Sequence, residues 1–437
     1  MYNICVNYDT EEKIIIMDFV HIILIVYLAL QLLIVCSYIP RIKLWFDGFK
    51  KQKHLINTNQ NKLAILLPAR NESKIIENLL LSIKNQTYPL ERFDVHVIVA
   101  DKNDKTIELT KKHLSNSYIH IIENQTRKAE ALDGAIKEII KSNLVYDDYI
   151  IIDADCILTT NFLEEMNNAL STGADIIIPR KRIKNWESNN KKNRNIWCNC
   201  SALTWPSVDT MGNKGKSKRN YTLALCGQGM LINAKILNNL NGYPFRSLVE
   251  DYEISIECMR NGYTQFYYEY AEIYSEEPIS HKEYNKRRVR WLQGFADVTK
   301  KYNKEVKNIT FKQGRIKKEN LFFLFGITPV YLMFSLSIVM ILTFLIIGLV
   351  LYFKGNPLYT TSLLFSIIPF AISYVELYIH GWFCIAQDRD INKMTKWEKI
   401  KLSFAYPFIV SEYIGIFFKS FLVKSEEKWE AIERINM

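Results

Sequence analysis

Two aspartates, one residue apart, close an apolar run near the middle of the chain. The run covers residues 149–152 and ends in Asp153-Ala154-Asp155. A short, β-rich apolar run predicts a buried strand of a parallel sheet, and ligands of open α/β sheets collect outside the carboxyl ends of such strands. Paired carboxylates there suit Mg²⁺ or Mn²⁺ holding the phosphates of a substrate. The alternative is that both acids only cap a turn and the next helix.

A second acid follows a neighbouring apolar run. From residue 62 the chain alternates apolar and amphipathic stretches, which predicts strands at 63–67, 95–100 and 118–122 and helices at 73–86, 105–114 and 128–141. Ser73 is the expected N-cap of the first helix. Strands joined by single helices predict a parallel sheet with right-handed crossovers. Asp101, which follows the second strand, is therefore expected at the same edge as Asp153.

Glu250 and Asp251 stand directly before an expected helix at 252–260. Acids in this position favour any helix N-terminus through the helix dipole, so one interpretation is structural. The other is catalytic, because a transfer reaction needs a base that deprotonates the incoming hydroxyl.

Residues 286–295 predict a helix with cations and an aromatic ring on one face. Arg287, Arg290, Trp291 and Gly294 follow the i, i+3, i+4 and i+7 spacing of a single helix face. A basic helix lying on a membrane surface is the structural alternative, and the two interpretations are compatible.

The composition is that of a folded, basic protein. The chain has 437 residues, of which 49% are apolar, so it is not disordered and has room for two domains or more. Its formal charge of +10 fits an anionic membrane surface or an anionic substrate. The eight cysteines include no C-x-x-C pair, so we expect reduced thiols rather than a metal site at Cys198 and Cys200.

Long apolar blocks predict membrane helices at both ends of the chain. Residues 14–39 are long enough to cross a bilayer, and the basic residues within 41–53 place that side in the cytoplasm. The later blocks are residues 321–353, 361–386 and 402–423. The first of them exceeds one span, so residues 321–330 are expected at the interface. The last contains Pro407, Glu412 and Lys419, which fits either a channel-facing helix or a surface helix.

A basic segment lies between residues 180 and 219. It holds eleven lysines and arginines and two acids, interleaved with Trp186, Trp197 and Trp205. Such a pattern occurs in nucleic-acid binding, which we disfavour here because the segment lies inside one unit and beside a membrane. We expect a loop that covers the donor site or touches anionic lipid.

Taken together, the motifs resemble family 2 glycosyltransferases of the membrane-bound branch, which includes cellulose, chitin, hyaluronan and poly-N-acetylglucosamine synthases. The resemblance covers roughly residues 62–300 and rests on motifs that occur in the family's order: Pro68-Ala69-Arg70-Asn71-Glu72, Val99-Ala100-Asp101, Lys128-Ala129-Glu130-Ala131-Leu132-Asp133-Gly134, Asp153-Ala154-Asp155, Gly227-Gln228-Gly229-Met230, Glu250-Asp251 and Arg287-Arg288-Val289-Arg290-Trp291. Arg287 stands where the family usually has Gln, and Asp133 where it usually has Asn. The first departure weakens the case for processive polymerisation.

The resemblance implies a role for each motif. The nucleotide of a UDP-sugar would be bound by Pro68, Arg70, Glu72, Asp101 and Lys128. Asp155, helped by Asp153, would hold Mg²⁺ or Mn²⁺ at the diphosphate. Asp251 matches the family's base, and one displacement with one base inverts the anomeric centre. The residues around the acceptor and the diphosphate would be Gly227, Gln228, Glu250, Arg287, Arg290 and Trp291.

These observations predict an α/β GT-A (Rossmann-like) cytosolic domain joined to an α-helical transmembrane region. The expected divisions are an N-terminal anchor at 1–40, a basic cytosolic linker at 41–61, the GT-A domain at 62–300, a basic interfacial segment at 301–320, membrane or interfacial helices at 321–423 and a tail at 424–437. The expected setting is the plasma membrane, with several spans, contact with membrane lipids and accessory export subunits, and no nucleic acid.

The expected activity is inverting transfer from a UDP-sugar to a growing polysaccharide at the cytosolic face of the membrane. One alternative transfers a single sugar to a lipid acceptor, either diacylglycerol or polyprenyl phosphate. Another is a non-catalytic subunit of polysaccharide export, which is disfavoured because the acids, Lys128 and Arg290-Trp291 are all present.

Overall fold

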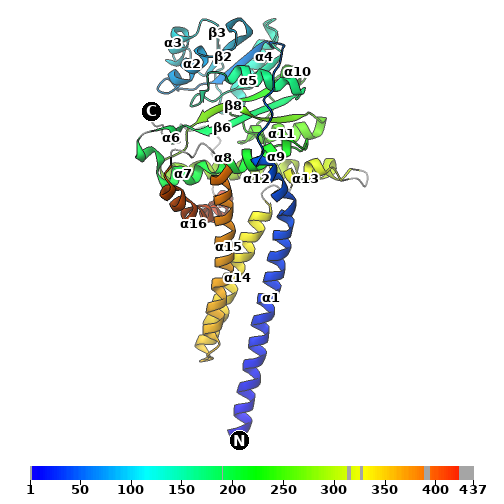
Figure 1. Ribbon diagram of the computed structural model, residues 1–437, viewed down its shortest axis with the longest axis vertical. Coiled ribbons are helices and arrows are strands. Elements are labelled where there is room, and N and C mark those ends of the chain that lie inside the picture. The colour runs from blue at the N-terminus through cyan, green and yellow to red at the C-terminus, as the bar shows by residue number, and fades with distance from the viewer. Residues whose placement is uncertain (1, 189, 313–315, 325–327, 388–393, 423–437) are drawn as a thin grey trace.

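The apolar runs between residues 63 and 275 come together in one eight-stranded sheet (Figure 1). The computed structural model describes residues 2–188, 190–312, 316–324, 328–387 and 394–422. The strand order is β3-β2-β1-β4-β7-β6-β8-β5. The strands are β1 Leu63–Pro68, β2 Phe93–Val99, β3 Ser117–Ile121, β4 Asp148–Ile151, β5 Ile157–Leu158, β6 Ile176–Ile183, β7 Met230–Asn233 and β8 Gln265–Ser275.

The sheet is mixed, so the prediction of a parallel sheet is correct only for its first half. β1 pairs in parallel with β2 and β4, and β2 with β3, which brings four carboxyl ends to one edge. β7 runs antiparallel to both β4 and β6. The loop that precedes β7 therefore lies at the same edge, where Gly229 N donates a hydrogen bond to Ile151 O at 2.8 Å.

Two apolar cores cover the two faces of the sheet. Alternate residues of β1 belong to different cores, since successive side chains of a strand point to opposite faces. Ile65 packs with α2 and α5, whereas Leu66 packs with α4. The helices of this domain are α2 Ile76–Lys84, α3 Thr106–His113, α4 Lys128–Lys141, α5 Phe162–Ala169, α10 Ala234–Asn239, α11 Glu250–Asn261 and α12 His281–Thr310, with short turns η1 Leu90–Arg92 and η2 Leu170–Thr172.

The start of α2 differs from the prediction. The helix begins at Ile76, its N-cap is Ile75 and no side chain caps it, so the prediction of Ser73 as the N-cap is wrong. The backbone carbonyl of Glu72 accepts from the N–H groups of both Ile75 and Ile76, at 3.0 Å each. Backbone hydrogen bonds to Glu72 O thus replace the side-chain cap that was expected from Ser73.

The basic segment 180–219 is a layer of short helices, so the prediction of a loop is wrong, whereas its place over the donor or against anionic lipid stays a prediction. Beyond β6 its elements are α6 Lys184–Glu187, η3 Lys191–Arg194, α7 Ile196–Ala202, α8 Thr204–Val208, η4 Asp209–Asn213 and α9 Lys214–Ser217. Lys181, Asp209 and Lys214 are buried within it. A Cβ on Gly215 would collide with the backbone of Leu44, so α9 lies directly against α1. The segment joins the sheet domain to the long helices.

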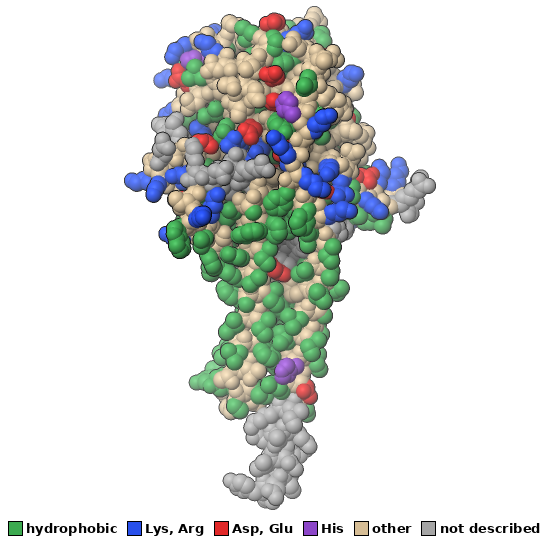
Figure 2. All heavy atoms as spheres, viewed as in Figure 1, with side chains coloured by type: hydrophobic (Ala, Val, Ile, Leu, Met, Phe, Trp, Pro, Cys, Tyr) green, Lys and Arg blue, Asp and Glu red, His purple; other side chains and the backbone are tan. Residues whose placement is uncertain are grey.

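Three of the described helices are long and apolar enough to cross a membrane, over Met17–Cys36, Ser335–Phe353 and Tyr359–Gln387. They belong to α1 Tyr2–Phe49, α14 Thr328–Phe353 and α15 Tyr359–Gln387, which run side by side away from the sheet domain (Figure 1). Figure 2 shows apolar side chains around them and lysines and arginines where they meet the domain. α1 continues unbroken past the predicted boundary at residue 40, and α12 past the one at residue 300.

The two remaining helices lie against the sheet domain. In α13 Lys318–Leu324, Asn320 accepts a hydrogen bond from Thr222 at 2.8 Å and Phe323 stacks on Tyr252, so this part of the block 321–353 is separate from α14. α16 Lys396–Leu422 is not among the candidate spans and packs on α7 and α12. It therefore fits the surface-helix interpretation. The tail 424–437 lies outside the described residues.

Candidate active site

Lys128 connects acids from two separate motifs. It is the first residue of α4, and its Nζ lies 2.5 Å from Asp153 Oδ1 and 3.7 Å from Glu250 Oε1. Burial alone would lower the pKa of Lys128, but Asp153 and Glu250 raise it above its ordinary value. The side chain is therefore a fixed ammonium at the carboxyl edge of the parallel strands.

Asp153 and Asp155 lie in a turn directly after β4. Cys156 N donates to Asp153 O at 3.0 Å, which closes the turn. Ala154 and Cys156 are buried in the core of the sheet, so the two aspartates, which are half-buried, face away from that core. The turn that the structural alternative predicted is present, and it also places both carboxylates at the edge of the sheet.

The donor set at this edge fits a divalent cation that is bound together with its substrate. No group of three His, Cys, Asp or Glu side chains able to hold a metal occurs in the part of the chain that the structure describes. Mg²⁺ typically takes one or two carboxylates, substrate phosphates and several waters. Asp155 and Asp153 supply that number of carboxylates.

Asp251 meets the backbone of the loop before β7. Its Oδ2 accepts from Gly227 N at 2.8 Å, and its Oδ1 from Tyr252 N at 2.9 Å. A Cβ on Gly227 would lie 3.3 Å from Lys128 Nζ, so this position leaves little room for a side chain between the lysine and the aspartate. The adjacent Gln228 has a buried Oε1 that accepts no hydrogen bond from any described residue.

Glu250 is the carboxyl group whose acidity changes most clearly at this edge. Its burial, together with repulsion from Asp251 and Asp153, raises the pKa of Glu250 to about 7, although Lys128 opposes the shift. A carboxyl group with such a pKa exchanges its proton near neutral pH.

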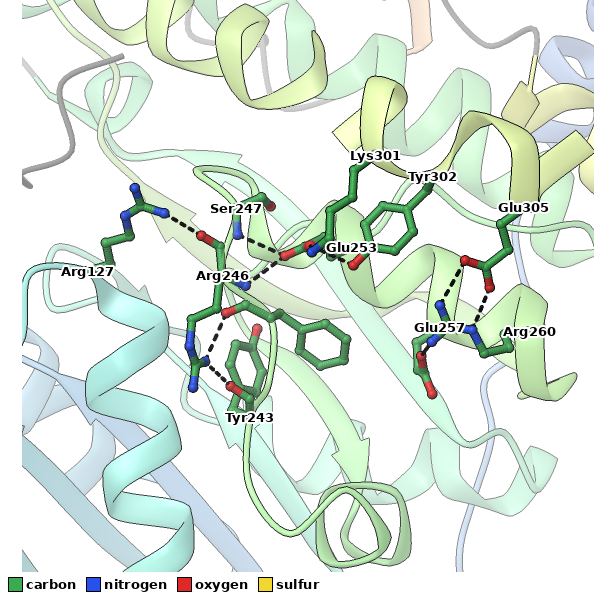
Figure 3. A network of polar contacts seen from close by, with 11 residues as sticks. Arg127, Tyr243, Arg246, Ser247, Glu253, Glu257, Arg260, Lys301, Tyr302 and Glu305 are labelled. Atoms are coloured by element: carbon green, nitrogen blue, oxygen red, sulfur yellow. Dashed lines mark hydrogen bonds and ion pairs between the residues drawn. The ribbon is translucent and has the colours of Figure 1, made fainter. Parts of the chain in front are cut away.

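A polar network holds the start of α11, which carries Glu250 and Asp251 (Figure 3). Its centre is Glu253, which is 2% exposed and accepts from the backbone N–H groups of Arg246 and Ser247 at 2.8 Å each. From α12, Lys301 Nζ and Tyr302 OH each donate to the same carboxylate at 3.0 Å. The loop, α11 and α12 are thus bound to one another.

Asp133 has a structural role, which the sequence pattern did not reveal. Its carboxylate accepts from Tyr243 N at 2.8 Å and pairs with Arg246 at 2.5 Å and Lys137 at 2.9 Å. Burial acts to raise the pKa of Asp133, but these donors outweigh it and lower the pKa. The acid at this position supports the same loop that Glu253 holds.

The predicted face of α12 does approach the acids. A Cβ on Gly294 would lie 2.9 Å from Val249, so the missing side chain lets the helix pack closely against the residues before Glu250. Arg290 forms no ion pair within 4 Å among the described residues, and burial and the neighbouring Arg287 lower its pKa. Glu250, Asp153 and Asp251 act on its pKa in the opposite direction, so Arg290 lies near these acids without a direct ion pair among the described residues.

Trp291 is enclosed by cations and another ring. The Cζ atoms of Arg287 and Arg288 lie 4.8 and 4.5 Å from the centroid of its ring, and Trp205 meets it edge-on at 5.8 Å. Arg287 also lies 3.3 Å from the carboxylate of Glu277. Trp291 is nevertheless partly exposed, and two guanidinium groups lie over the aromatic plate that the sequence predicted.

The other predicted donor-binding residues lie farther along the strand edge. Pro68 ends β1 and pairs with Ile98 of β2, and Arg70 donates to Gln125 O at 3.2 Å. Asp101 follows β2, is exposed, and accepts from Asn103 N at 2.9 Å. Glu72 stands in the turn before α2. These residues and Asp153 follow the carboxyl ends of β2, β1 and β4, and Lys128 reaches the same edge from the start of α4.

Several residues near the site were missed by the sequence pattern. Glu277 is fully buried and accepts from Trp205 Nε1 at 2.6 Å. Lys181 is 3% exposed, and its ammonium lies 4.6 Å from the centroid of Trp205. Glu276 and Glu277 follow the apolar strand β8 just as Asp153 follows β4, so the same strand-end rule would have found them.

A comparison with known families identifies the family of this chain. The model of glycosyl transferase family group 2 matches residues 150–375, which include Asp153, Asp251 and Trp291. The chain belongs to glycosyl transferase family group 2. Among curated proteins, this glycosyltransferase is 25% identical to the probable glycosyltransferase YdaM of Bacillus subtilis, over 86% of this chain and 87% of that one. It is 23% identical to a probable glycosyltransferase of Sulfolobus acidocaldarius, over 74% and 67% of the two chains.

The glycosyltransferase also has a similar solved structure. The mannosyltransferase PcManGT of Pyrobaculum calidifontis, solved with GDP-mannose and Mn²⁺, superposes with a TM-score of 0.52 and 15% identity over 90% of this chain and 99% of the other. This likeness extends to nearly all of both chains, and it shows that the glycosyltransferase has the GT-A fold.

The pKa of Glu250 predicts a stability that depends on pH. In the unfolded chain this carboxyl group ionises near pH 4.5, but in the folded protein it keeps its proton to about pH 7. The folded state therefore binds more protons between these values, and wild-type stability falls as pH rises through this window. In Glu250→Gln, the free energy of unfolding should fall less than in the wild type over this window, by up to about 3 kcal/mol.

Apparent melting temperatures of the detergent-purified protein, without donor or metal, would be measured from pH 4.5 to 7.5. Glu108→Gln, on the exposed side of α3, is the matched control and should follow the wild type. Parallel curves for the wild type and Glu250→Gln would contradict the prediction.

Proposed function

We propose that this glycosyltransferase performs inverting transfer from a nucleoside-diphosphate sugar to a hydroxyl group, with Asp251 as the base. The observation that carries the proposal is the meeting of Lys128, Asp153, Glu250, Asp251 and Gly227 at one sheet edge. These residues come from three motifs far apart in the chain. If Lys128 were only a solvated surface lysine, or Asp251 only an acid that favours a helix N-terminus, the two side chains would not need to meet at this edge.

The donor would lie along the carboxyl ends of β2, β1 and β4. Its nucleotide would contact Asp101, Arg70, Glu72 and Pro68, and its diphosphate would reach Lys128. The resemblance in the sequence implies a UDP-sugar, whereas the similar solved structure holds GDP-mannose. A panel of UDP-sugars and GDP-sugars would therefore identify both the nucleobase and the sugar of the donor.

Charge on the leaving diphosphate would be neutralised from two sides. Asp155 and Asp153 would hold Mg²⁺ or Mn²⁺, which withdraws electron density from the phosphate oxygens when bound. Arg290 would supply a second positive charge, which is consistent with its lack of an ion pair among the described residues. Such fixed charges stabilise a developing anion because they need no reorganisation during the reaction.

The acceptor hydroxyl would lie against Asp251 and the loop that contains Gly227 and Gln228. Hydrogen bonds from the backbone hold the Asp251 carboxylate, so its position does not depend on the acceptor. The sequence implies a growing polysaccharide, with a lipid acceptor as the alternative. The two guanidinium groups over the ring of Trp291 favour the second candidate, since a glycan chain would have to displace one of them to pack on the ring.

We also propose that the catalytic domain is cytosolic and that α1, α14 and α15 cross the plasma membrane. The basic residues after the first candidate span, and the lysines and arginines at the base of the domain in Figure 2, support this orientation. Contacts with anionic lipid headgroups would follow, and accessory export subunits remain part of the polysaccharide alternative.

Asp251→Asn should separate donor binding from chemistry. The amide has nearly the same shape, so donor affinity should stay within about twofold, while turnover should fall by roughly two to four orders of magnitude. Calorimetry would measure donor binding, and mass spectrometry would measure transfer. Asp297→Asn, on the exposed surface of α12, is the control. Full transfer by Asp251→Asn would show that another group is the base.

Asp155→Ala should abolish metal-dependent transfer. Loss of one metal ligand should cost several kcal/mol of leaving-group stabilisation, or roughly a thousandfold in rate, while the protein still inserts in the membrane. The measurement is transfer against Mn²⁺ and Mg²⁺ concentration, with EDTA as the blank and Asp297→Ala as the control. Normal turnover of the wild type in EDTA would refute the metal site.

A cysteine at Val145 should report the orientation. Val145 is 82% exposed in the loop between α4 and β4, whereas Cys156 and Cys258 are buried and would not react on either side. A membrane-impermeant maleimide should leave Val145→Cys unlabelled in intact cells and label it after permeabilisation. The control is a cysteine-free parent. Labelling in intact cells would place the domain outside.

A further inference from the structure

We propose that Arg287 caps the ring of Trp291 and restricts this glycosyltransferase to adding one sugar to a lipid-borne acceptor. The inference rests on the proposed function, and it names the acceptor class and the residue that limits product length. Two separate features carry it, the enclosure of Trp291 and the filled interior of the three candidate spans.

A sugar ring packs on tryptophan through its C–H groups and needs an open face of the indole. Two guanidinium groups already lie over Trp291, with their Cζ atoms at 4.8 Å for Arg287 and 4.5 Å for Arg288. Such cation–ring contacts are favourable by roughly 0.5–2 kcal/mol each. A second sugar unit of a growing chain would have to displace one of them.

Arg287 is held in its capping position by a buried acid. Its Nη1 lies 3.3 Å from Glu277 Oε1 and donates to Glu276 O at 3.3 Å. Glu277 has no exposed surface and also accepts from Trp205 Nε1 and Ser201 Oγ. Moving Arg287 aside would leave a buried carboxylate without its cation, which is costly. The cap is therefore a fixed part of the site.

Arg288 has a different task on the same helix. It is 1% exposed, donates to Ser201 Oγ at 2.8 Å and Thr204 Oγ1 at 2.9 Å, and lies 5.5 Å from the ring of Tyr413 in α16. It binds α12 to α7, α8 and α16, so removing it would disturb the fold. Arg287 makes fewer such contacts between helices, so it is the guanidinium to substitute, and Arg287→Lys keeps a cation beside Glu277.

Where the structure describes their side chains, the three candidate spans pack directly on one another. Tyr27, Met340 and Phe344 fill the centre of the bundle, where Phe344 has no exposed surface. Gln31 of α1 donates to Tyr27 OH at 3.0 Å and to Ser337 Oγ of α14 at 2.9 Å, and Ser373 of α15 donates to Ser337 Oγ at 2.8 Å. These four polar side chains inside the described bundle thus bond to one another. A product made at the domain would stay on its own side, attached to its lipid.

The test compares product length in wild type and Arg287→Gln. Each protein, in nanodiscs made with a total lipid extract, is incubated with excess of the donor that the panel selects, and the lipid products are sized by mass spectrometry. We expect one added sugar per lipid from the wild type at any time, and a series of two or more from Arg287→Gln. Lys282→Gln removes an exposed charge from the same helix and should keep single addition.

A binding measurement tests the cap without turnover. A soluble oligosaccharide of the transferred sugar, titrated by calorimetry, should bind Arg287→Gln at least tenfold more tightly than the wild type. Trp291→Ala combined with Arg287→Gln should lose this gain, because the exposed ring is its source. If Arg287→Gln does not purify as a monodisperse protein, Arg287→Lys replaces it, since lysine can keep the pair with Glu277 without a planar group over the ring.

Each other outcome overturns a specific claim. Polymer from the wild type, single addition by both proteins, or unchanged oligosaccharide binding would overturn the cap. An Arg287→Gln protein that binds donor but makes no product would assign Arg287 to the diphosphate, and would also overturn the cap. A wild type that neither transfers nor hydrolyses any donor would instead overturn the proposed function.

Discussion

The positive charge of Lys128 is the constraint on which the rest of the site depends. Two carboxylates, Asp153 and Glu250, lie within 4 Å of its ammonium, and Asp251 lies just beyond them across Gly227. Three acids brought together at one edge repel one another, and each unit of pKa shift represents about 1.4 kcal/mol. Burial, together with repulsion from Asp251 and Asp153, raises the pKa of Glu250 although Lys128 opposes the shift. The edge is therefore suited to further positive charge.

That arrangement is supported by structure that carries no chemistry of its own. Glu253 and Asp133 each hold the loop before α11, through backbone donors and through Arg246. Gly294 lets α12 approach the same loop. Because these contacts are buried and charge-assisted, they hold the acids in place before any substrate binds. Contacts that form on folding thus offset the free-energy cost of bringing the acids together, and substrate binding does not have to supply it.

The layer of short helices at 184–217 connects this site to the long helices. Gly215 of α9 packs against α1, and Arg288 of α12 donates hydrogen bonds to Ser201 and Thr204. The ring of Trp205 meets the ring of Trp291 edge-on. The ring that resembles an acceptor platform is therefore part of the contact between the domain and its membrane-facing layer. A change in the packing of α12 on that layer would alter the acceptor side of the site. The strand edge that faces the donor would stay unchanged.

Local patterns by themselves determined the strands β1 to β4, the helix α4, the candidate spans and the acids at strand ends, because periodicity and strand-end position depend on neighbours in the chain. The tertiary structure decided the rest. β7 enters antiparallel and brings Gly227 to Asp251, the segment at 180–219 that was expected to be a loop is a layer of short helices, and Trp205 of that layer meets Trp291 of α12. These features join residues far apart in sequence. Their geometry depends on how helices and strands cross, and no local spacing of residues carries that information.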